Sequence, residues 1–196
     1  MGVNNLTTHI KLTSKGFLDA QGHWGHKKER LNHSSNIHVL GFKNDFTIIN
    51  PEHFLEYSKR CNIFCSKTIL NGGNIFFINS NDEYKKLIIY FGSRSLQPIH
   101  YNKWFGGLLT NNFFKNPCVF VMSNVSKNSF ILKEASKKLI PVISIEDSDY
   151  SFNKAFYSVL GNDDSKQSLS FFYSNLTNHI IKSLLYNHCK SLYKNK

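Results

Sequence analysis

Three short segments hold the side chains that could do chemistry in this chain. Their residue types would suit metal binding, acid–base catalysis or contact with a phosphate backbone. The segments are His23-Trp24-Gly25-His26 followed by Lys27, Lys28 and Arg30; Lys103-Trp104-Phe105-Gly106-Gly107-Leu108-Leu109-Thr110-Asn111; and Gly161-Asn162-Asp163-Asp164.

The first segment combines two histidines with an aromatic ring and nearby cations. His23 and His26 could both bind zinc, but two ligands do not complete a site and no other histidine has a matching spacing. A glycine-containing turn with cations suits a phosphate backbone instead, while its rings can stack on bases or sugars. The alternative is a capped turn with solvated lysines. We predict that Lys27, Lys28 and Arg30 contact phosphates, that the histidines order the loop, and that no metal binds.

The second segment is predicted to be a loop with an RNA-facing edge. Its glycine pair permits close approach of the backbone, and Lys103 can pair with a phosphate. Trp104 and Phe105 are predicted to anchor the loop in the core, whereas Asn111 belongs to its polar edge.

The third segment has two adjacent carboxylates, which could serve a metal or a catalytic site. Asp163 and Asp164 stand where a helix is expected to begin, so we predict that they cap it by accepting backbone N–H bonds. The nearest other carboxylates are Asp147 and Asp149. The chain has no G-x-G-x-x-G, Walker or G-x-S-x-G sequence, which argues against a nucleotide cradle or a nucleophile elbow. We therefore predict no catalysis, no cofactor and no small-molecule substrate.

Composition indicates a large anionic partner. The 196 residues carry 24 Lys and Arg against 13 Asp and Glu, a net charge of +11, which attracts polyanions. Four irregularly spaced cysteines do not form a disulfide scaffold, so a reducing compartment is expected. No apolar run reaches the roughly 18 residues needed to span a bilayer, and no membrane partner is predicted. Heavy use of Asn, Lys, Ile and Phe is typical of an adenine- and thymine-rich gene.

The elements that must position these segments alternate between short apolar runs and amphipathic stretches. This pattern predicts an α/β fold, a three-layer α/β/α sandwich with a mostly parallel sheet of about five strands, of the Rossmann or flavodoxin type. Strands are expected at residues 37–41, 47–49, 74–78, 119–123, 142–145 and 156–159. Helices are expected from Pro51 to the glycines at 72–73, after an Asn-Ser-Asn cap at 79–81, over about 127–139, and from Asp163 through Leu184.

One domain is expected, because the chain shows no repeat, linker or low-complexity segment. Within it we predict an N-terminal RNA-facing segment at 1–35, an α/β core at 36–184 and a basic tail at 185–196. Residues 93–116 break the alternation and are expected to form a structured loop.

Taken together, the segments resemble the family of the second protein of the small ribosomal subunit, over residues 18–180. The opening His-Trp-Gly-His is similar to that family's His-Phe-Gly-His, and residues 103–111 are similar to its Arg-Trp-Leu-Gly-Gly-Leu-Thr-Asn loop. Residues 46–50, Glu134-Ala135, residues 140–143 and Gly161-Asn162-Asp163-Asp164 complete the resemblance. On this basis Trp104, Gly106, Gly107, Gly161, Asn162, Asp163 and Asp164 are the residues of its structural motifs.

The chain also departs from the family pattern. Leu31-Asn32-His33 replaces a Trp-Asn-Pro, and Asn79-Ser80-Asn81 replaces a Gly-Thr-Lys that could contact phosphate. Bacterial members insert a long helical hairpin after the Leu-Thr-Asn loop, whereas here Pro117 follows Asn111 closely. The missing hairpin and the biased composition resemble mitochondrial members.

The resemblance implies a non-catalytic constituent of the small mitochondrial ribosomal subunit, located in the mitochondrial matrix. It implies small-subunit rRNA and neighbouring ribosomal proteins as partners in translation. The predicted rRNA contacts are Lys27, Lys28, Arg30, His23, His26, Lys103 and Asn111. Two other hypotheses remain: a nucleotide-binding α/β enzyme, and an interaction module that uses its basic surface on proteins or membranes.

Overall fold

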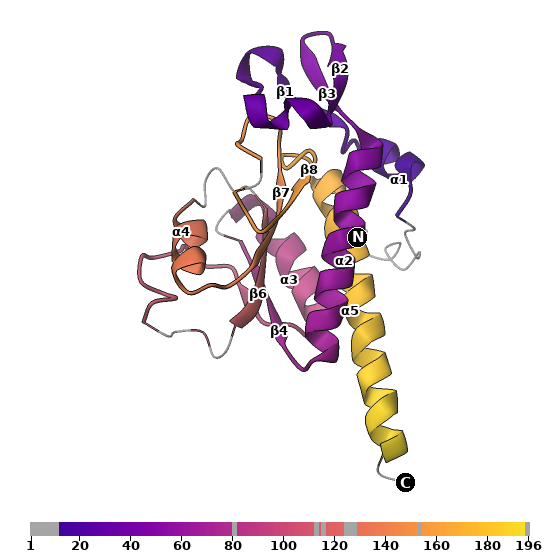
Figure 1. Cartoon of the computed structure of the whole chain (residues 1–196), viewed down its shortest axis with the longest axis vertical. Coiled ribbons are helices and arrows are strands. Elements are labelled where there is room, and N and C mark those ends of the chain that lie inside the picture. Colours follow the sequence, from indigo (N-terminus) through magenta and orange to yellow (C-terminus); the bar gives the residue numbers. More distant parts are fainter. Residues whose placement is uncertain are drawn as a thin grey trace.

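Five parallel strands form the central sheet of the computed structural model, which describes residues 12–79, 82–111, 114, 117–123, 129–152 and 154–194 (Figure 1). The strands lie side by side in the order β5-β4-β6-β7-β8. Their bounds are β4 Asn74–Ile78, β5 Ile99–His100, β6 Pro117–Ser123, β7 Val142–Glu146 and β8 Tyr157–Leu160. Numbered along the chain, these parallel strands have the order 2-1-3-4-5, which is the flavodoxin type.

Helices cover both faces of this sheet, which confirms the predicted three-layer α/β fold. Strand β4 shows the division, because Ile75 and Phe77 pack with α2, α3 and α5 whereas Phe76 and Ile78 pack with α4. Figure 1 shows α4 alone on one side of the sheet. The helices are α1 Ser14–Asp19, α2 Pro51–Leu70, α3 Lys85–Arg94, α4 Ser129–Lys137 and α5 Lys166–Lys194. Strands buried on both faces explain the continuous apolar runs of the sequence.

Helix α2 begins and ends where its sequence predicts. Pro51 occupies the first turn, and the Asn50 side chain accepts a hydrogen bond from the N–H of Glu52 at 2.9 Å. Asn71 follows the last turn, and Gly72 adopts a positive φ of 78°, which favours glycine.

Two of the six predicted strands do not belong to the parallel sheet, which corrects the sequence-based assignment. They form a separate antiparallel sheet with β1 (Trp24–Lys27), in the order β1-β3-β2. Strand β2 is Val39–Lys43 and β3 is Phe46–Ile49. The first two residues of the strand predicted at 37–41 lie instead in a 3₁₀ helix, η2 (His33–His38). Asn44 and Asp45 both have positive φ, 49° and 64°, as a tight hairpin turn between twisted strands requires.

The stretch between α3 and β6 is mainly a loop, as predicted, apart from the two residues of β5. In place of a helix, Trp104, Leu109 and Phe114 cover the sheet face on the α4 side. Trp104 is therefore a packing residue, as expected, but Phe105 is 63% exposed and the prediction for it was wrong. Residues 112, 113, 115 and 116 lie outside the described residues.

Two predicted helix caps differ from the structure. A 3₁₀ turn, η3 (Asp82–Tyr84), precedes α3, and Tyr84 makes no side-chain cap bond; Ser80 and Asn81 lie outside the described residues. Before α5, the Asn162 Oδ1 accepts the N–H groups of Asp164 and Ser165, each at 3.0 Å, and so orders the turn that leads into the helix at Lys166. The bonds that were predicted for the carboxylates of Asp163 and Asp164 are thus made one turn earlier by an amide oxygen.

The last helix continues through the predicted basic tail. Helix α5 packs against α2 and extends to Lys194 without a break at residue 184 (Figure 1). Its final turns expose Leu185, Tyr186, Leu192 and Tyr193. The predicted helix over about 127–139 is α4, and the part of that prediction at 127–128 falls outside the described residues. Among the described helices, none has both the length and the apolar character of a membrane span.

Candidate functional site

The N-terminal segment is fastened to the loop that follows β7. The N–H of His26 donates to Ser148 Oγ at 2.9 Å, and Thr47 Oγ1 donates to the His26 carbonyl at 2.9 Å. The N–H of Asn32 donates to the Ser148 carbonyl, also at 2.9 Å. Gly25 allows this approach, since a Cβ there would lie 2.3 Å from Thr47 Oγ1 and 2.7 Å from Ser148 Oγ. The small sheet is thereby held over the carboxyl ends of the parallel strands, where open α/β sheets bind ligands.

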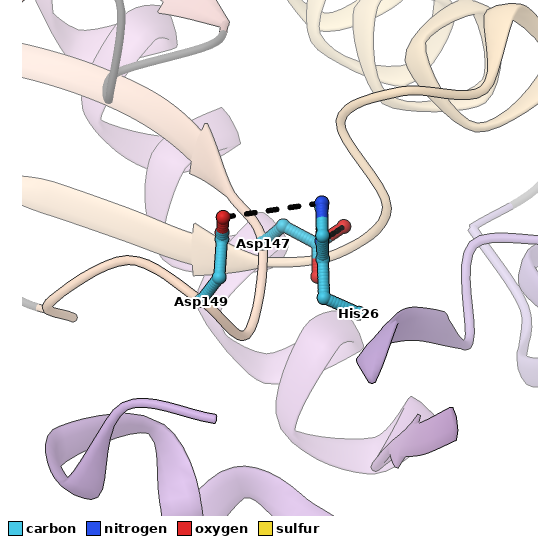
Figure 2. Close-up of side chains that lie close together, drawn as sticks. All are labelled: His26, Asp147 and Asp149. Carbon is cyan, nitrogen blue, oxygen red and sulfur yellow. Dashed lines mark ion pairs between the residues drawn. The ribbon is translucent and has the colours of Figure 1, made fainter. Parts of the chain in front are cut away.

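His26 lies among carboxylates that come from two different loops, of which Figure 2 draws Asp147 and Asp149 from the loop after β7. Its Nδ1 is 3.0 Å from Asp147 Oδ2, and its Nε2 is 3.4 Å from Asp164 Oδ2 and 3.9 Å from Asp149 Oδ2. The hydrogen bond to Asp147, together with the negative charges of the three carboxylates, outweighs burial and raises the pKa of His26 to about 9. The imidazole is therefore a cation at neutral pH.

A fourth carboxylate, Asp163, lies close enough to this cluster to interact with its charges. It is 6% exposed, and burial, followed by the negative charges of Asp147, Asp164 and Asp149, raises its pKa to about 8. Glu146, the last residue of β7, is also buried, and burial raises its pKa to about 7 although Ser144 and Ser158 donate hydrogen bonds to it. Acidic residues at the ends of neighbouring parallel strands are thus concentrated at one point.

A cleft of about 650 Å³ opens beside this cluster. Its walls come from β1, from the hairpin between β2 and β3, and from the loops after β7 and β8. The lining residues are Trp24, Gly25, His26, Lys27, Arg30, Asn44, Phe46, Asp147, Asn162 and Asp164. His26 therefore shares one surface with the predicted RNA contacts Lys27 and Arg30, and with Asn162 of the third sequence motif.

Cations and rings alternate on the small sheet next to the cleft. Lys28 Nζ lies 5.0 Å from the centre of the Phe42 ring, and Lys43 Nζ lies 6.0 Å from the Trp24 ring. Phe42 and Phe46 are exposed. Burial and the charge of Lys43 lower the pKa of His23, so this ring is neutral at pH 7. We call this surface, formed by Trp24, Lys27, Lys28, Arg30, Phe42, Lys43 and Phe46, the basic-aromatic face.

The loop at 103–111 is held by α4 rather than by the small sheet. Glu134 accepts hydrogen bonds from the N–H groups of Gly107 (2.7 Å) and Leu109 (3.1 Å). Gly107 has a φ of +95°, so the glycine is required there. Lys103 and Asn111 are both exposed, but neither lines the cleft. Of the seven predicted RNA contacts, the structure therefore gathers the five from His23 to Arg30 and leaves these two on a separate surface.

Three functional residues were missed by the sequence prediction. Lys43 reaches Trp24 only through the hairpin, and Glu134 was identified only as part of a motif. Asp149 was noted but not joined to His26. The sequence could have indicated that Asp149 lies near Asp164. Asp149 follows β7 and Asp164 follows β8, and the carboxyl ends of adjacent parallel strands meet at one edge of the sheet.

The paired His26 and Asp147 match the base and its orienting carboxylate in hydrolases, but within the described residues no hydroxyl or thiol is hydrogen-bonded to the imidazole. Ser148 Oγ bonds to the His26 N–H and to Thr47 rather than to the imidazole nitrogens. Nε2, which would activate a nucleophile, faces Asp149 and Asp164 instead. Among the described residues the arrangement fits ion binding and charge pairing rather than acyl transfer.

Comparison with known proteins adds a family to this geometry. The model of the ribosomal protein S2 family matches residues 17–116 and 112–183. A small ribosomal subunit protein uS2 of Leifsonia xyli subsp. xyli is 24% identical, with 87% of this chain and 72% of the relative covered. Those of Thermus thermophilus and Francisella philomiragia are 22% and 24% identical, covering 89% and 85% of this chain and 87% and 90% of the relatives.

Proposed function

Since the chain belongs to the ribosomal protein S2 family, we propose that it binds small-subunit rRNA through its basic-aromatic face and acts in a mitochondrial ribosome. The family establishes a structural role in the small ribosomal subunit. The identity of the RNA-binding surface and the organelle are the further steps that we propose.

The basic-aromatic face is the observation that carries the RNA-binding proposal. It places Lys27 and Lys43 of the small sheet, together with Lys28 and Arg30 of the 3₁₀ turn that follows β1, next to exposed rings. Ammonium and guanidinium groups neutralise phosphates, and aromatic rings stack on unpaired bases or on sugars. Because the net charge is +11 and none of these four cations forms an ion pair within the described residues, they are available to a polyanion.

Lys103 and Asn111 form a second proposed contact surface. The loop that carries them is ordered by Glu134 and anchored by Trp104, so the two polar side chains sit on a defined edge. Its distance in the fold from the small sheet means that one RNA would have to reach two surfaces, as folded rRNA can do.

The mitochondrial proposal rests on the missing hairpin and on composition. The two pieces of the family match meet at residues 112–116, where bacterial members are expected to carry the hairpin. Composition supports the same proposal, since the chain has 17 Phe and is rich in Asn, Lys and Ile. The relatives compared above are bacterial, so the organelle needs a direct test.

Sedimentation of a mitochondrial lysate in magnesium, with and without ribonuclease, tests both steps. We expect the chain to migrate with the small ribosomal subunit and to leave that position after ribonuclease treatment. Migration as a free small protein in both gradients would reject ribosome association, and migration with ribosomes of the cytosolic fraction alone would reject the mitochondrial proposal.

Substitution of the face then tests the surface. Lys28→Ala with Lys43→Ala should reduce the share of the chain in the subunit peak, whereas Lys59→Ala with Lys67→Ala removes the same charge from exposed positions of α2 and should leave it unchanged. Equal effects of both pairs would mean that net charge, rather than this face, governs association.

A further inference from the structure

The connection from β7 to β8 differs from the other crossovers of a typical parallel sheet. The two strands are parallel neighbours joined by residues 147–156, and the described part of this segment contains no helix. Parallel strands are usually joined by a crossover helix that covers the sheet. Because right-handed crossovers from β6 to β7 and from β7 to β8 lie on the same face, the missing helix belongs beside α4. Figure 1 shows α4 alone on that side of the sheet.

A groove of about 510 Å³ lies beside α4. It runs between the end of α4 and the segment before β8, and it reaches Phe64 of α2. Most of its lining is apolar and comes from Leu132, Leu139, Ile140, Val142, Ala155 and Phe156. Leu139 is 90% exposed and Phe156 is 68% exposed, so two large apolar side chains face solvent at this groove. Exposed apolar side chains that gather in one place are typical of a protein-binding surface.

Leu139 has a backbone conformation that favours glycine. Its φ is +55°, and it lies in the turn that ends α4, where the N–H of Ile140 donates to the Ala135 carbonyl at 2.9 Å. Glycine is the usual residue at this position of a helix end, because a side chain there is strained. Since the leucine is almost fully exposed, its side chain contributes little to the fold of its own chain. Contact with another molecule explains a side chain that is both strained and exposed.

The surface around the groove is basic. Lys154 lies in the lining, and Lys133 and Lys137 are exposed on α4. None of the three forms an ion pair within the described residues. The one acidic residue of α4, Glu134, points to the loop at 103–111, where its two oxygens accept backbone N–H groups. An occupant with carboxylates beside an apolar stripe therefore complements the groove in both charge and polarity.

We propose that this groove binds an acidic amphipathic helix of a neighbouring ribosomal protein, which takes the position of the missing crossover helix. Apolar side chains of that helix, three or four residues apart, pack on Leu139 and Phe156, while its carboxylates face the lysines. A second copy of this chain carries the same net charge of +11 and is repelled, and the phosphates of RNA gain nothing from an apolar lining. The proposal rests on the role in the small ribosomal subunit, but it is independent of the basic-aromatic face and of the organelle.

Zero-length cross-linking of the native complex tests the proposal. A carbodiimide joins a lysine directly to a carboxylate that it touches. Small ribosomal subunits from a sedimentation gradient are treated with it, and the joined peptides are identified by mass spectrometry. We expect Lys133, Lys137 or Lys154 to be joined to Asp or Glu of one other protein, in a segment whose apolar residues recur every three or four positions.

The other outcomes overturn the proposal. Subunits that contain the chain but give no such cross-link, or a cross-link only to a second copy of this chain, exclude the acidic helix and leave the ribosomal role intact. Ultraviolet cross-linking of Phe156 to RNA in the same subunits assigns the groove to RNA instead. Absence of the chain from the subunit fraction is seen in the gradient itself, and it overturns the ribosomal role together with this proposal.

Replacement of Leu139 by glycine separates binding from folding. The probe is a synthetic peptide of the cross-linked segment, titrated with the purified full chain by fluorescence anisotropy. Leu139→Gly should weaken binding by about 10-fold, because the contact of the leucine is lost. Its denaturation midpoint should be no lower than that of the parent, because glycine adopts the positive φ without strain. Leu96→Gly is the matched control, since Leu96 ends α3 with a φ of 53°, is 83% exposed and lies outside the groove. Equal affinities of the two variants would overturn the assignment of the groove.

Discussion

Single atoms decide how closely the N-terminal segment can approach the β7 loop, and Gly25 is the clearest case. Thr47 and Ser148 are fully buried and hydrogen-bonded to each other at 2.9 Å, so neither can move away from an added Cβ. We expect Gly25→Ala to lower the free energy of unfolding by about 1–3 kcal/mol, as overpacking in a tight core does. Chemical denaturation measures this loss.

Gly41→Ala is the matched control for that substitution. Gly41 lies in β2 of the same small sheet, and a Cβ there would meet nothing within 4 Å. The alanine should be tolerated within about 0.5 kcal/mol. A Gly25→Ala chain as stable as the Gly41→Ala chain would show that the contact between the segment and the loop is loose.

His38 makes the stability of the folded chain depend on pH. Its Nδ1 lies 2.9 Å from His53 Nδ1, and its ring packs against Phe152 with centroids 4.3 Å apart. Burial and the neighbouring His53 lower the pKa of His38 below the ordinary 6.5. The unfolded chain therefore takes up a proton before the folded chain does, so stability present above pH 6.5 is lost as pH falls through the folded pKa.

The measurement is the free energy of unfolding from about pH 7 to about pH 5. We expect a shallower decline in His38→Asn, which keeps a donor near the position of Nδ1 but does not titrate, than in the wild type. His33→Gln, at an exposed position, should retain the wild-type slope. Parallel curves for His38→Asn and the wild type would assign the pH dependence to other groups.

At the scale of elements, Glu134 shows how α4 shapes the loop at 103–111. One carboxylate oxygen accepts the N–H of Gly107 at 2.7 Å and the other accepts that of Leu109 at 3.1 Å. Hydrogen bonds to a charged acceptor contribute about 1.5–3 kcal/mol. In Glu134→Ala we therefore expect amide hydrogen exchange in this loop to become roughly 10- to 100-fold faster.

Glu56→Ala provides the comparison, since Glu56 pairs with Arg60 on an exposed face of α2 and should leave loop exchange unchanged. If exchange at Gly107 and Leu109 stays slow without Glu134, the anchoring by Trp104 is sufficient to order the loop.

Elements with a strong local signal could be predicted from the sequence, whereas those defined by long-range pairing could not. Helix α2 has its cap, its proline and its terminal glycine within the segment itself, and the strands of the parallel sheet are continuous apolar runs. Strand β1 has only four residues and exists because β3 pairs with it, 24 residues later in the first aligned pair, Trp24 with Ile48. The Asn44-Asp45 turn was the available sign of a hairpin.

The same difference between local signals and long-range pairing explains which residues of the site could be predicted from the sequence. Cations close together in the sequence, at 27–30, also share a surface in the fold. The cluster around His26 joins residues more than 120 positions apart, and Ser148 alone is 122 residues from His26. Such a cluster depends on strand order, and the order of β7 and β8 was not predicted beyond the fold type.

For the molecule as a whole, the distribution of charge over the surface matters more than the net charge. The acidic cluster is confined to the loops after β7 and β8. Beside it lie the cations of the small sheet and of the 3₁₀ turn that follows β1, which are Lys27, Lys28, Arg30 and Lys43. A polyanion is therefore attracted to one side of the cleft and repelled by the other, which orients it. Orientation by phosphate contacts without base readout is the usual role of such cations.

The salt dependence of RNA binding distinguishes this orientation from attraction to net charge alone. Each phosphate contact that is removed should reduce the slope of log affinity against log salt by roughly 0.7–0.9. With small-subunit rRNA as the probe, Lys27→Ala with Lys28→Ala should therefore lower the slope by roughly 1.4–1.8. Lys59→Ala with Lys67→Ala gives the same net charge, 11 − 2 = +9, and should leave the slope nearly unchanged. Two equal slopes would mean that the RNA responds to total charge, and that the basic-aromatic face is not the surface it contacts.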